Sequence, residues 1–387
     1  LPICEKDCDD GDPNRCGLRF GVASMQGWRE EMEDAHVALP DFDPEKGISL
    51  FGVFDGHGGG AVALLVSKRL PNTLRSLEEY RAGEYKEALR KAFLQQDEYL
   101  RSPQGKKELK SLKRKANQEV DPQLMGTTAV VALICRKEDQ QQLYVANCGD
   151  SRAVMISGAG AVAMSEDHSP RLPMELRRIR EAGGSVNKEG RVNGNLNLSR
   201  AIGDFFYKRN KKLGVDRQLI IAVPEVRQRK LGSGDRYLLL GCDGVWERYT
   251  NQEIVDFLLP RLQKEELFSK ACSEFLDRAL SKNPMRTRGL GCDNMTLLCA
   301  QLCPDPSDKK DSLVGTESQQ LKAPSRRAER RIALTLSVFQ PGTGRPYSCR
   351  STRRRALLLR ERLSKKPIAF WKKISVPFSR EFTAGKG

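Results

Sequence analysis

Acidic residues recur in short turns that adjoin apolar, strand-like segments of the chain. The clearest example is Asp55, which ends the apolar run 50–54 and opens the turn Asp55-Gly56-His57-Gly58-Gly59. Comparable acidic positions adjoin four other apolar segments, at Asp34, Asp150, Asp243 and Asp293. Carboxylates gathered in one place repel one another and raise each other's pKa values, so they need a counter-charge. Hard divalent cations with oxygen ligands supply it, and the pattern therefore indicates a metal site.

Each of these turns also has an ordinary explanation. Asp and Gly favour tight turns because of their backbone dihedral preferences, so a single Asp-Gly step carries little information. The recurrence of a carboxylate at the end of one apolar segment after another is what favours metal binding.

The elements that would position these carboxylates follow from hydrophobic periodicity. Strands are predicted at 17–25, 35–39, 50–54, 127–135, 143–147, 152–157, 160–164, 237–242 and 294–301. Helices are predicted at 61–77, 84–100, 172–182, 251–262 and 265–282. Strands at hairpin spacing, interrupted by pairs of helices, predict an α+β fold in which helices cover antiparallel sheets.

Composition narrows the class of protein. No run of the 387 residues approaches the roughly 18 apolar residues that a membrane helix needs, and a hydrophobic content of 39% is typical of a globular protein. The eleven cysteines form no Cys-x-x-Cys pair, which argues against a zinc site built from several thiolates. Several lie in apolar strands, as buried free thiols in a reducing compartment would.

Charge divides the chain into a nearly neutral body and a basic tail. The net charge is +16, and residues 304–387 hold 20 Lys and Arg against 7 Asp and Glu. We expect residues 1–16 to be a loose acidic leader, 17–303 a single catalytic domain, and 101–123 an exposed basic insert within it. The sequence begins at Leu1 and not at a methionine, so we expect that an original N-terminus, with any targeting segment, has been removed.

The tail leaves three interpretations open. Residues 304–387 read as a disordered, solvated segment, as a nuclear-import signal read by an import receptor, or as contact with an anionic membrane surface. Nuclear or cytoplasmic localisation is expected.

Seven motifs occur in a fixed order and together carry a resemblance to a known family. They are Arg29-Glu30-Glu31-Met32-Glu33-Asp34, Asp55-Gly56-His57-Gly58-Gly59, Gly126-Thr127-Thr128-Ala129, 147–152, Ser199-Arg200-Ala201-Ile202-Gly203-Asp204, Cys242-Asp243-Gly244-Val245-Trp246 and Asp293-Asn294-Met295-Thr296. Over about residues 17–302 the chain resembles the metal-dependent protein serine/threonine phosphatases of type 2C, the PPM family. The departures from the family are the basic insert and the tail.

The resemblance implies a fold and a metal centre. The fold would be a four-layer αββα sandwich, two antiparallel β-sheets flanked by helices, with two Mg²⁺ or Mn²⁺ ions at one edge. Asp55 would bridge the ions, the carbonyl of Gly56 would bind one of them, and Asp243 and Asp293 would bind the other. Three further acidic residues would lie close by: Glu33 and Asp34 binding the ions through waters or orienting those waters, and Asp150 joining Asp243 in a weaker third site.

The resemblance also implies a reaction and its catalytic residues. Phosphoserine and phosphothreonine in phosphoprotein substrates would be hydrolysed by direct attack of a metal-bridging water, with no phosphoenzyme. Arg29 would bind the phosphate in a bidentate manner, and His57 would protonate the leaving oxygen. Asp204 would be a structural hydrogen-bond partner, with contact to a metal ion as the alternative, and His36 and His168 would have no catalytic role. A flap over 165–198 would contribute to substrate choice, and the protein would be a monomer.

Two other functions remain alternatives. The first is a catalytically silent binding protein on the same fold. It is weakened by the presence of Asp55, Asp243 and Asp293, since such relatives would be expected to lose metal ligands. The second is nucleic-acid or membrane binding through the basic tail.

Overall fold

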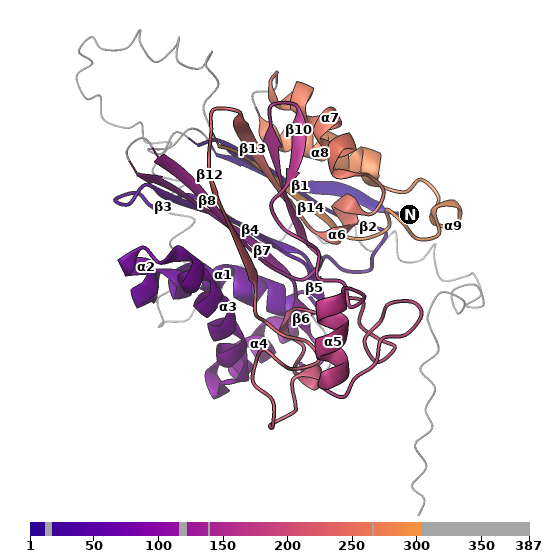
Figure 1. The fold of residues 1–387 in the computed structure, drawn as a ribbon. Coiled ribbons are helices and arrows are strands. Elements are labelled where there is room, and N and C mark those ends of the chain that lie inside the picture. Colours follow the sequence, from indigo (N-terminus) through magenta and orange to yellow (C-terminus); the bar gives the residue numbers. More distant parts are fainter. Residues whose placement is uncertain (12–17, 116–121, 138–139, 265–266, 303–387) are drawn as a thin grey trace, which may run out of the picture. The chain divides into compact units, whose positions relative to one another are not determined.

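The computed structural model describes residues 1–11, 18–115, 122–137, 140–264 and 267–302, all within the first of two units of the chain, Leu1–Gly315. Two antiparallel sheets form its centre (Figure 1). The first has the strand order β1 (Ile3–Gly11), β2 (Phe20–Gly27), β14 (Met295–Gln301), β13 (Asp235–Gly241), β9 (Arg152–Ser157) and β10 (Gly160–Ala163). The second has the order β12 (Glu225–Lys230), β8 (Gln140–Cys148), β7 (Ala129–Lys137), β4 (Ile48–Phe54) and β3 (Ala35–Asp43). A small third sheet joins β11 (Ile202–Gly203), β6 (Gly126–Thr127) and β5 (Gly56–His57).

Helices cover the outer face of each large sheet. Against the second sheet lie α1 (Ala61–Ser76) and α3 (Tyr85–Arg101), and α2 (Glu78–Ala82) and α4 (Pro103–Lys115) pack against these two helices. Against the first sheet lie α7 (Asn251–Leu262) and α8 (Phe268–Ala279). Shorter helical segments are α5 (Pro173–Glu181), the 3₁₀ turn η1 (Phe205–Tyr207), α6 (Asp243–Trp246) and α9 (Pro284–Thr287).

Strand β4 shows why the sheets stack as two inner layers. Its side chains alternate between the two faces of the sheet, as in any strand. Phe51 and Val53 enter the core between the sheets, whereas Leu50 and Phe54 pack in a second core beneath the helices. Both faces of β4 are buried, so the sheet needs a covering layer on each side. The predicted four-layer αββα sandwich is confirmed.

The expectation of a loose leader is wrong for residues 3–11. They form β1, which pairs antiparallel with β2 at the edge of the first sheet. Side chains also attach it to α8: Lys6 Nζ donates to Asp277 Oδ1 over 2.6 Å, and Asp10 Oδ1 accepts a hydrogen bond from the backbone N of Ser269 over 2.9 Å. Because this strand is held by backbone pairing and distant partners, its polar sequence gives no indication of it.

The exposed basic insert expected at 101–123 is a helix in its first part. Helix α4 occupies Pro103–Lys115 and packs against α1 and α3. Leu109 is buried, while Lys106, Lys107 and Lys110 are exposed, so the basic residues form the outer face of an amphipathic helix.

Most predicted elements agree with the structure to within a few residues. The bounds of the helix at 251–262 and the strand at 152–157 are confirmed as predicted. Within the described part of the chain, no helix is both long and apolar enough to cross a membrane. The tail at 304–387 lies outside the described residues, so its suggested partners stay predictions.

Candidate metal centre

The predicted acidic residues meet where strands of both large sheets end. Asp55 directly follows β4, and Asp243 begins α6 just after β13. Asp293 precedes β14 by two residues, and Asp150 lies in the turn between β8 and β9. Segments nearly 240 residues apart in the chain thus deliver carboxylates to one place.

These carboxylates form overlapping groups within reach of a single cation. One oxygen from each of Asp55, Asp150 and Asp243 lies within 4.8 Å of the others. The same limit holds for Asp243, Glu247 and Asp293. Asp243 belongs to both groups, so the two form one continuous cluster.

The electrostatics show that the positive charge at this cluster, supplied by Arg29 beside Asp293, is too little for so many carboxylates. Burial, followed by the neighbouring carboxylates, raises the pKa values of Asp55 and Asp243 well above their usual range. Burial likewise raises the pKa of Asp34 to about 7 and that of Asp150 to about 6. The Oδ1 atom of Asp34 is shielded and has no hydrogen-bond partner among the described residues. A set of crowded oxygen donors with an unpaired buried oxygen fits hard divalent cations.

Arg29 extends along the same cluster. Its Nη2 donates to Asp293 Oδ2 over 2.5 Å, and its side chain is 58% exposed. It borders a cavity of about 90 Å³, which is lined by Arg29, Glu33, Asp55, Gly56, His57, Thr128, Asp150, Asn197, Leu198, Asp243 and Asp293. The guanidinium can therefore contact an anion that enters the cavity.

His57 is held at the cavity by Asp204. The distance from His57 Nε2 to Asp204 Oδ2 is 2.7 Å, and Asp204 is 1% exposed. Burial alone would lower the pKa of His57, but the Asp204 carboxylate outweighs it and the pKa is raised. A Cβ at Gly126 would lie 2.4 Å from Asp204 Oδ2 and 2.5 Å from His57 Nε2, so a side chain there would displace the pair. The prediction that Asp204 is a hydrogen-bond partner is confirmed.

Three other predicted residues also lie at the centre. Asp34 Oδ2 accepts a hydrogen bond from Thr296 Oγ1 over 2.8 Å, which fixes its carboxylate beside Asp55. Glu33 lines the cavity, and its backbone N donates to Asn294 Oδ1 over 2.9 Å. A Cβ at Gly56 would lie 2.4 Å from the carbonyl oxygen of Glu33, so only glycine allows this close approach.

Two neighbours of the predicted ligands were missed by sequence reasoning. Glu247 joins the cluster from α6, and its Oε2 also accepts a hydrogen bond from Gly291 N over 2.8 Å. Its spacing of four residues from Asp243, one helical turn, could have indicated it. Cys242 was interpreted as a buried thiol in an apolar strand, yet it also lies beside Asp34 and Asp55. No pattern in the sequence indicates that proximity.

The other two histidines lie apart from the cavity. His168 is 2% exposed, and its Nδ1 accepts a hydrogen bond from the backbone N of Gly149 over 3.1 Å. His36 is half-buried on β3, and burial lowers its pKa. Neither lines the cavity that holds His57.

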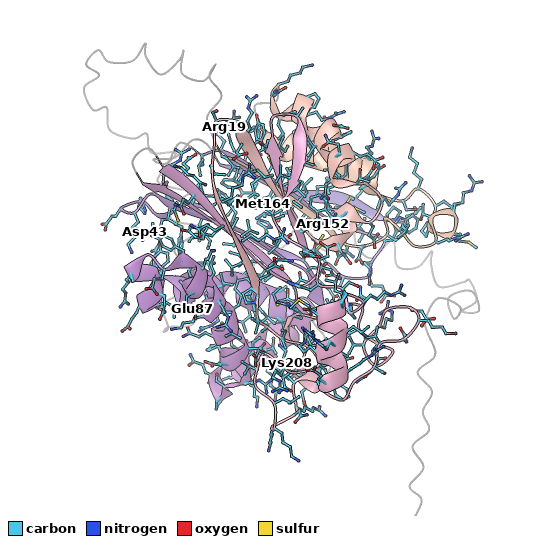
Figure 2. All side chains as sticks on the ribbon, viewed as in Figure 1. Arg19, Asp43, Glu87, Arg152, Met164 and Lys208 are labelled. Atoms are coloured by element: carbon cyan, nitrogen blue, oxygen red, sulfur yellow. The ribbon has the colours of Figure 1, made fainter. Side chains whose placement is uncertain are left out.

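The flap has its own core and its own ion pairs. Ile179, Val192, Leu198, Ala201, Tyr207 and Ile220 form a small apolar cluster. Buried Glu175 accepts hydrogen bonds from Arg178, Arg200 and Ser199, over 2.5, 2.6 and 2.6 Å. Two further ion pairs lie near the two ends of the flap, and Figure 2 labels one residue of each. Arg152 pairs with Asp167 near the start of the flap. Lys208, which follows the end of the flap in the sequence, pairs with Asp97 of α3. The flap brings Asn197 and Leu198 to the cavity.

Comparison with known proteins gives a consistent result. Residues 18–286 match the family model described as Protein phosphatase 2C. The chain is 46% identical over 287 residues to Probable protein phosphatase 2C 2 of Paramecium tetraurelia, an alignment that covers 73% of this chain and 92% of that protein. It is 39% identical over 356 residues to Probable protein phosphatase 2C 58 of Oryza sativa subsp. japonica, covering 84% and 94% of the two chains.

A solved structure is similar as well. The crystal structure of a phosphatase from a pathogenic strain of Toxoplasma gondii superposes with a TM-score of 0.60 at 25% identity. The match covers 76% of this chain and 95% of that one. The likeness therefore extends over most of this chain and nearly all of that one.

Proposed function

Because the chain belongs to the protein phosphatase 2C family, we propose that it hydrolyses phosphoserine and phosphothreonine in proteins by direct attack of water, with two divalent cations, Mg²⁺ or Mn²⁺. The observation that carries this proposal is the convergence of Asp55, Asp150, Asp243 and Asp293 around one cavity that Arg29 and His57 also line. Bound cations would lower the pKa of a water and neutralise charge on the phosphoryl oxygens.

The residues that would hold the cations follow from the geometry. Asp55 belongs to two of the three groups, with Asp34 in one and with Asp243 in the other, so it is placed to contribute to both ions. Asp243 and Asp293 would hold the second ion, with Glu247 close enough to contribute. Asp150 lies within reach of both Asp55 and Asp243, as a weaker third site would require.

The lining of the cavity supports water as the nucleophile. Its only hydroxyl side chain is Thr128, among residues that the structure describes. Thr128 Oγ1 accepts a hydrogen bond from Asp55 N over 3.2 Å and lies 2.6 Å from Ser151 Oγ, so it is held by two hydrogen bonds. A phosphoenzyme formed on this hydroxyl would need a base hydrogen-bonded to it, and neither Asp55 N nor Ser151 Oγ is a base.

Arg29 and His57 would perform the remaining tasks. The guanidinium of Arg29 is exposed enough to turn from Asp293 toward a phosphate and offer two parallel hydrogen bonds. His57, kept in its charged form by Asp204, would give a proton to the serine or threonine oxygen as it leaves. Arg29 would thus bind the phosphoryl group, and His57 would protonate the leaving serine or threonine oxygen.

Phosphate release from a phosphothreonine peptide tests the proposal. The full chain should hydrolyse the peptide with Mn²⁺ and stop when EDTA is added. Asp41→Ala removes an exposed carboxylate of β3 far from the cluster and is the matched control. Activity that survives EDTA, or that Asp243→Ala leaves unchanged, would contradict the metal mechanism. A silent binding protein would release no phosphate in any of these samples.

A further inference from the structure

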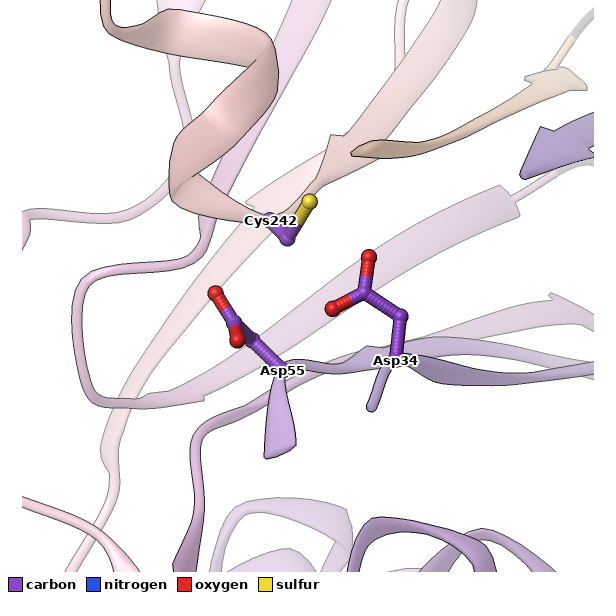
Figure 3. A group of neighbouring side chains, drawn as sticks. All are labelled: Asp34, Asp55 and Cys242. Atoms are coloured by element: carbon purple, nitrogen blue, oxygen red, sulfur yellow. The ribbon is translucent and has the colours of Figure 1, made fainter. Parts of the chain in front are cut away.

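A cavity of about 820 Å³ lies between the edge strands of the two large sheets, and residues of β1, β3 and α1 form most of its lining. Strand β1 ends the first sheet and β3 ends the second, so each pairs with a neighbour on one side only. Asp34 lines this cavity too, but Figure 3 shows its carboxyl group pointing toward Asp55 and Cys242 of the metal centre. The cavity is distinct from the one that Arg29 and His57 line.

The free edge of β3 runs along this cavity. Val37 packs in the core beneath α1, whereas Ala38 packs in the core between the sheets. His36 shares the face of Ala38, because side chains alternate along a strand. His36 and Val37 both line the cavity, so the cavity extends around the edge of the strand. Among the described residues, the backbone of 35–39 pairs with β4 alone, and its other side can accept a further strand.

Strand β1 makes one wall of the cavity acidic. Glu5 and Asp7 line the cavity, and both are exposed. Burial lowers the pKa of His36 and the charge of Asp7 opposes that effect, so this carboxylate lies near β3. Lys6 also lines the cavity, but its ammonium group is already paired with Asp277 of α8 over 2.6 Å. This wall therefore favours basic side chains.

Helix α1 makes the opposite wall apolar. Leu64 of α1 and Leu39 of β3 line the cavity and are 38% and 36% exposed, so an apolar side chain that covers them would remove hydrocarbon surface from water. Lys68 of α1 lines the cavity as well and is exposed. A basic side chain on this side would be repelled by Lys68, so this wall favours apolar side chains.

We propose that an extended segment of a partner protein adds to the free edge of β3 as a further strand. Its basic side chains point toward β1 and alternate with apolar side chains that point toward α1. Backbone pairing supplies affinity, and the two unlike walls supply specificity. The alternation follows from the period of two in a strand, which sends consecutive side chains to opposite walls. The inference does not depend on the proposed hydrolysis, because Asp7, Leu39 and Leu64 lie outside the metal centre.

A short peptide that alternates lysine with valine tests the proposal, with fluorescence anisotropy of the labelled peptide on the full chain as the readout. It should bind at least about tenfold more tightly than a peptide of the same composition whose lysines form one block, because only the alternating peptide matches both walls. Equal affinities for the two peptides would overturn the proposal.

Backbone pairing has a test of its own. Alternate N–H groups of a strand point toward the same neighbour, so methylating the backbone nitrogens of the lysines blocks one edge of the peptide. Methylating those of the valines blocks the other edge. One of these two peptides should lose binding and the other should keep it. Equal binding by both would overturn strand addition.

A charge reversal tests the acidic wall. Asp7→Lys should weaken binding of the alternating peptide at least about tenfold, and circular dichroism checks that the variant is folded. Asp216→Lys is the matched control, because it makes the same change of charge at an exposed residue outside the lining. Equal affinities of Asp7→Lys and the control would overturn the proposal. Sedimentation of the full chain tests a second copy as the occupant, and a dimer that the alternating peptide dissociates would overturn the assignment to a separate partner.

Discussion

The metal centre and the flap treat buried carboxylates in opposite ways. In the centre, Asp55 and Asp243 face other acids, and their pKa values are raised by burial and by those neighbours. At the base of the flap, burial alone would raise the pKa of Glu175, but Arg200 and Arg178 outweigh it and lower the pKa to about 2. Both regions belong to one domain, and they differ in how fully the protein's own arginines balance the carboxylates.

This difference distinguishes carboxylates that are available to bind a cation from carboxylates that stabilise the fold. A buried carboxylate that is already paired with arginines, such as Glu175, does not need a cation. Its ion pairs stabilise the position of the flap. A cluster whose charge is unmatched is costly without a ligand and is stabilised when a cation arrives. Uncompensated carboxylates therefore mark the functional region better than burial or acidity alone.

Removing a carboxylate from the centre should have the largest effect on activity. Asp243→Asn keeps the size of the side chain and removes its charge, so phosphopeptide hydrolysis should fall by about 10³-fold or more. In EDTA the variant should melt at the same or a higher temperature than the wild type, because repulsion within the cluster is relieved. Steady-state kinetics and thermal melting measure the two effects. A marked loss of metal-free stability would contradict the view that this carboxylate is unpaired.

Asp204 tests whether His57 needs its partner. In Asp204→Asn the histidine loses the carboxylate that holds it, so hydrolysis of a phosphothreonine peptide should fall about 10²-fold. An aryl phosphate should be affected less, because its leaving group needs little protonation. Asp216→Asn, an exposed acid after the flap, is the matched control. Equal losses for both substrates would argue against proton donation by His57.

Glu175 should affect stability more than chemistry. Glu175→Gln leaves Arg178 and Arg200 without their buried counter-charge, and the free energy of unfolding should fall by about 3 kcal/mol. Urea denaturation measures it, with the exposed Glu181→Gln on the same helix as control. An unchanged midpoint for Glu175→Gln would mean that the flap does not depend on this network.

Acid should weaken the same network, and the sign follows from the pKa values. The pKa of Glu175 is about 2 in the fold and near 4.5 when exposed, so its contribution is complete above about pH 4.5 and is lost as the pH falls toward 2. The stability gap between the wild type and Glu175→Gln should therefore be constant from pH 6.5 to 5 and shrink below about pH 4.5. Urea midpoints at several pH values measure the gap. A gap that widens in acid would contradict the assignment.

His168 gives a second acid-sensitive contribution. Burial lowers its pKa to about 3 from the ordinary 6.5, so the unfolded chain takes up a proton that the folded chain refuses. Stability should fall as the pH drops from about 6.5 toward 3, and His168→Gln should flatten this part of the pH profile of thermal melting. A profile that the variant leaves unchanged would show that His168 is not held neutral.

Local patterns made most of the fold predictable from the sequence. Helix α7 was predicted with its bounds from hydrophobic periodicity, and in the structure Thr250 and Glu253 form a capping box at its start. Strand β1 could not be predicted, because its polar residues are ordered by pairing with β2 and by partners on α8. Helix α4 was hidden by its lysines, although Leu109 and Leu112 mark an apolar face at helical spacing.

The candidate site shows the same limit. Strand-end carboxylates such as Asp55 could be picked out by residue type and motif. Cys242 and the link between His57 and Asp204 could not, because they depend on which distant segments meet in space. The chemistry of a single residue can be predicted from its type and its motif. Chemistry that depends on which residues lie next to one another can be predicted only once the fold is known.

Anomalous diffraction from a crystal grown with Mn²⁺ tests the central claim most directly. The account predicts manganese peaks within coordination distance of the carboxylate oxygens of Asp55 and Asp243. A well-ordered crystal in saturating Mn²⁺ with no peak among these carboxylates would contradict it.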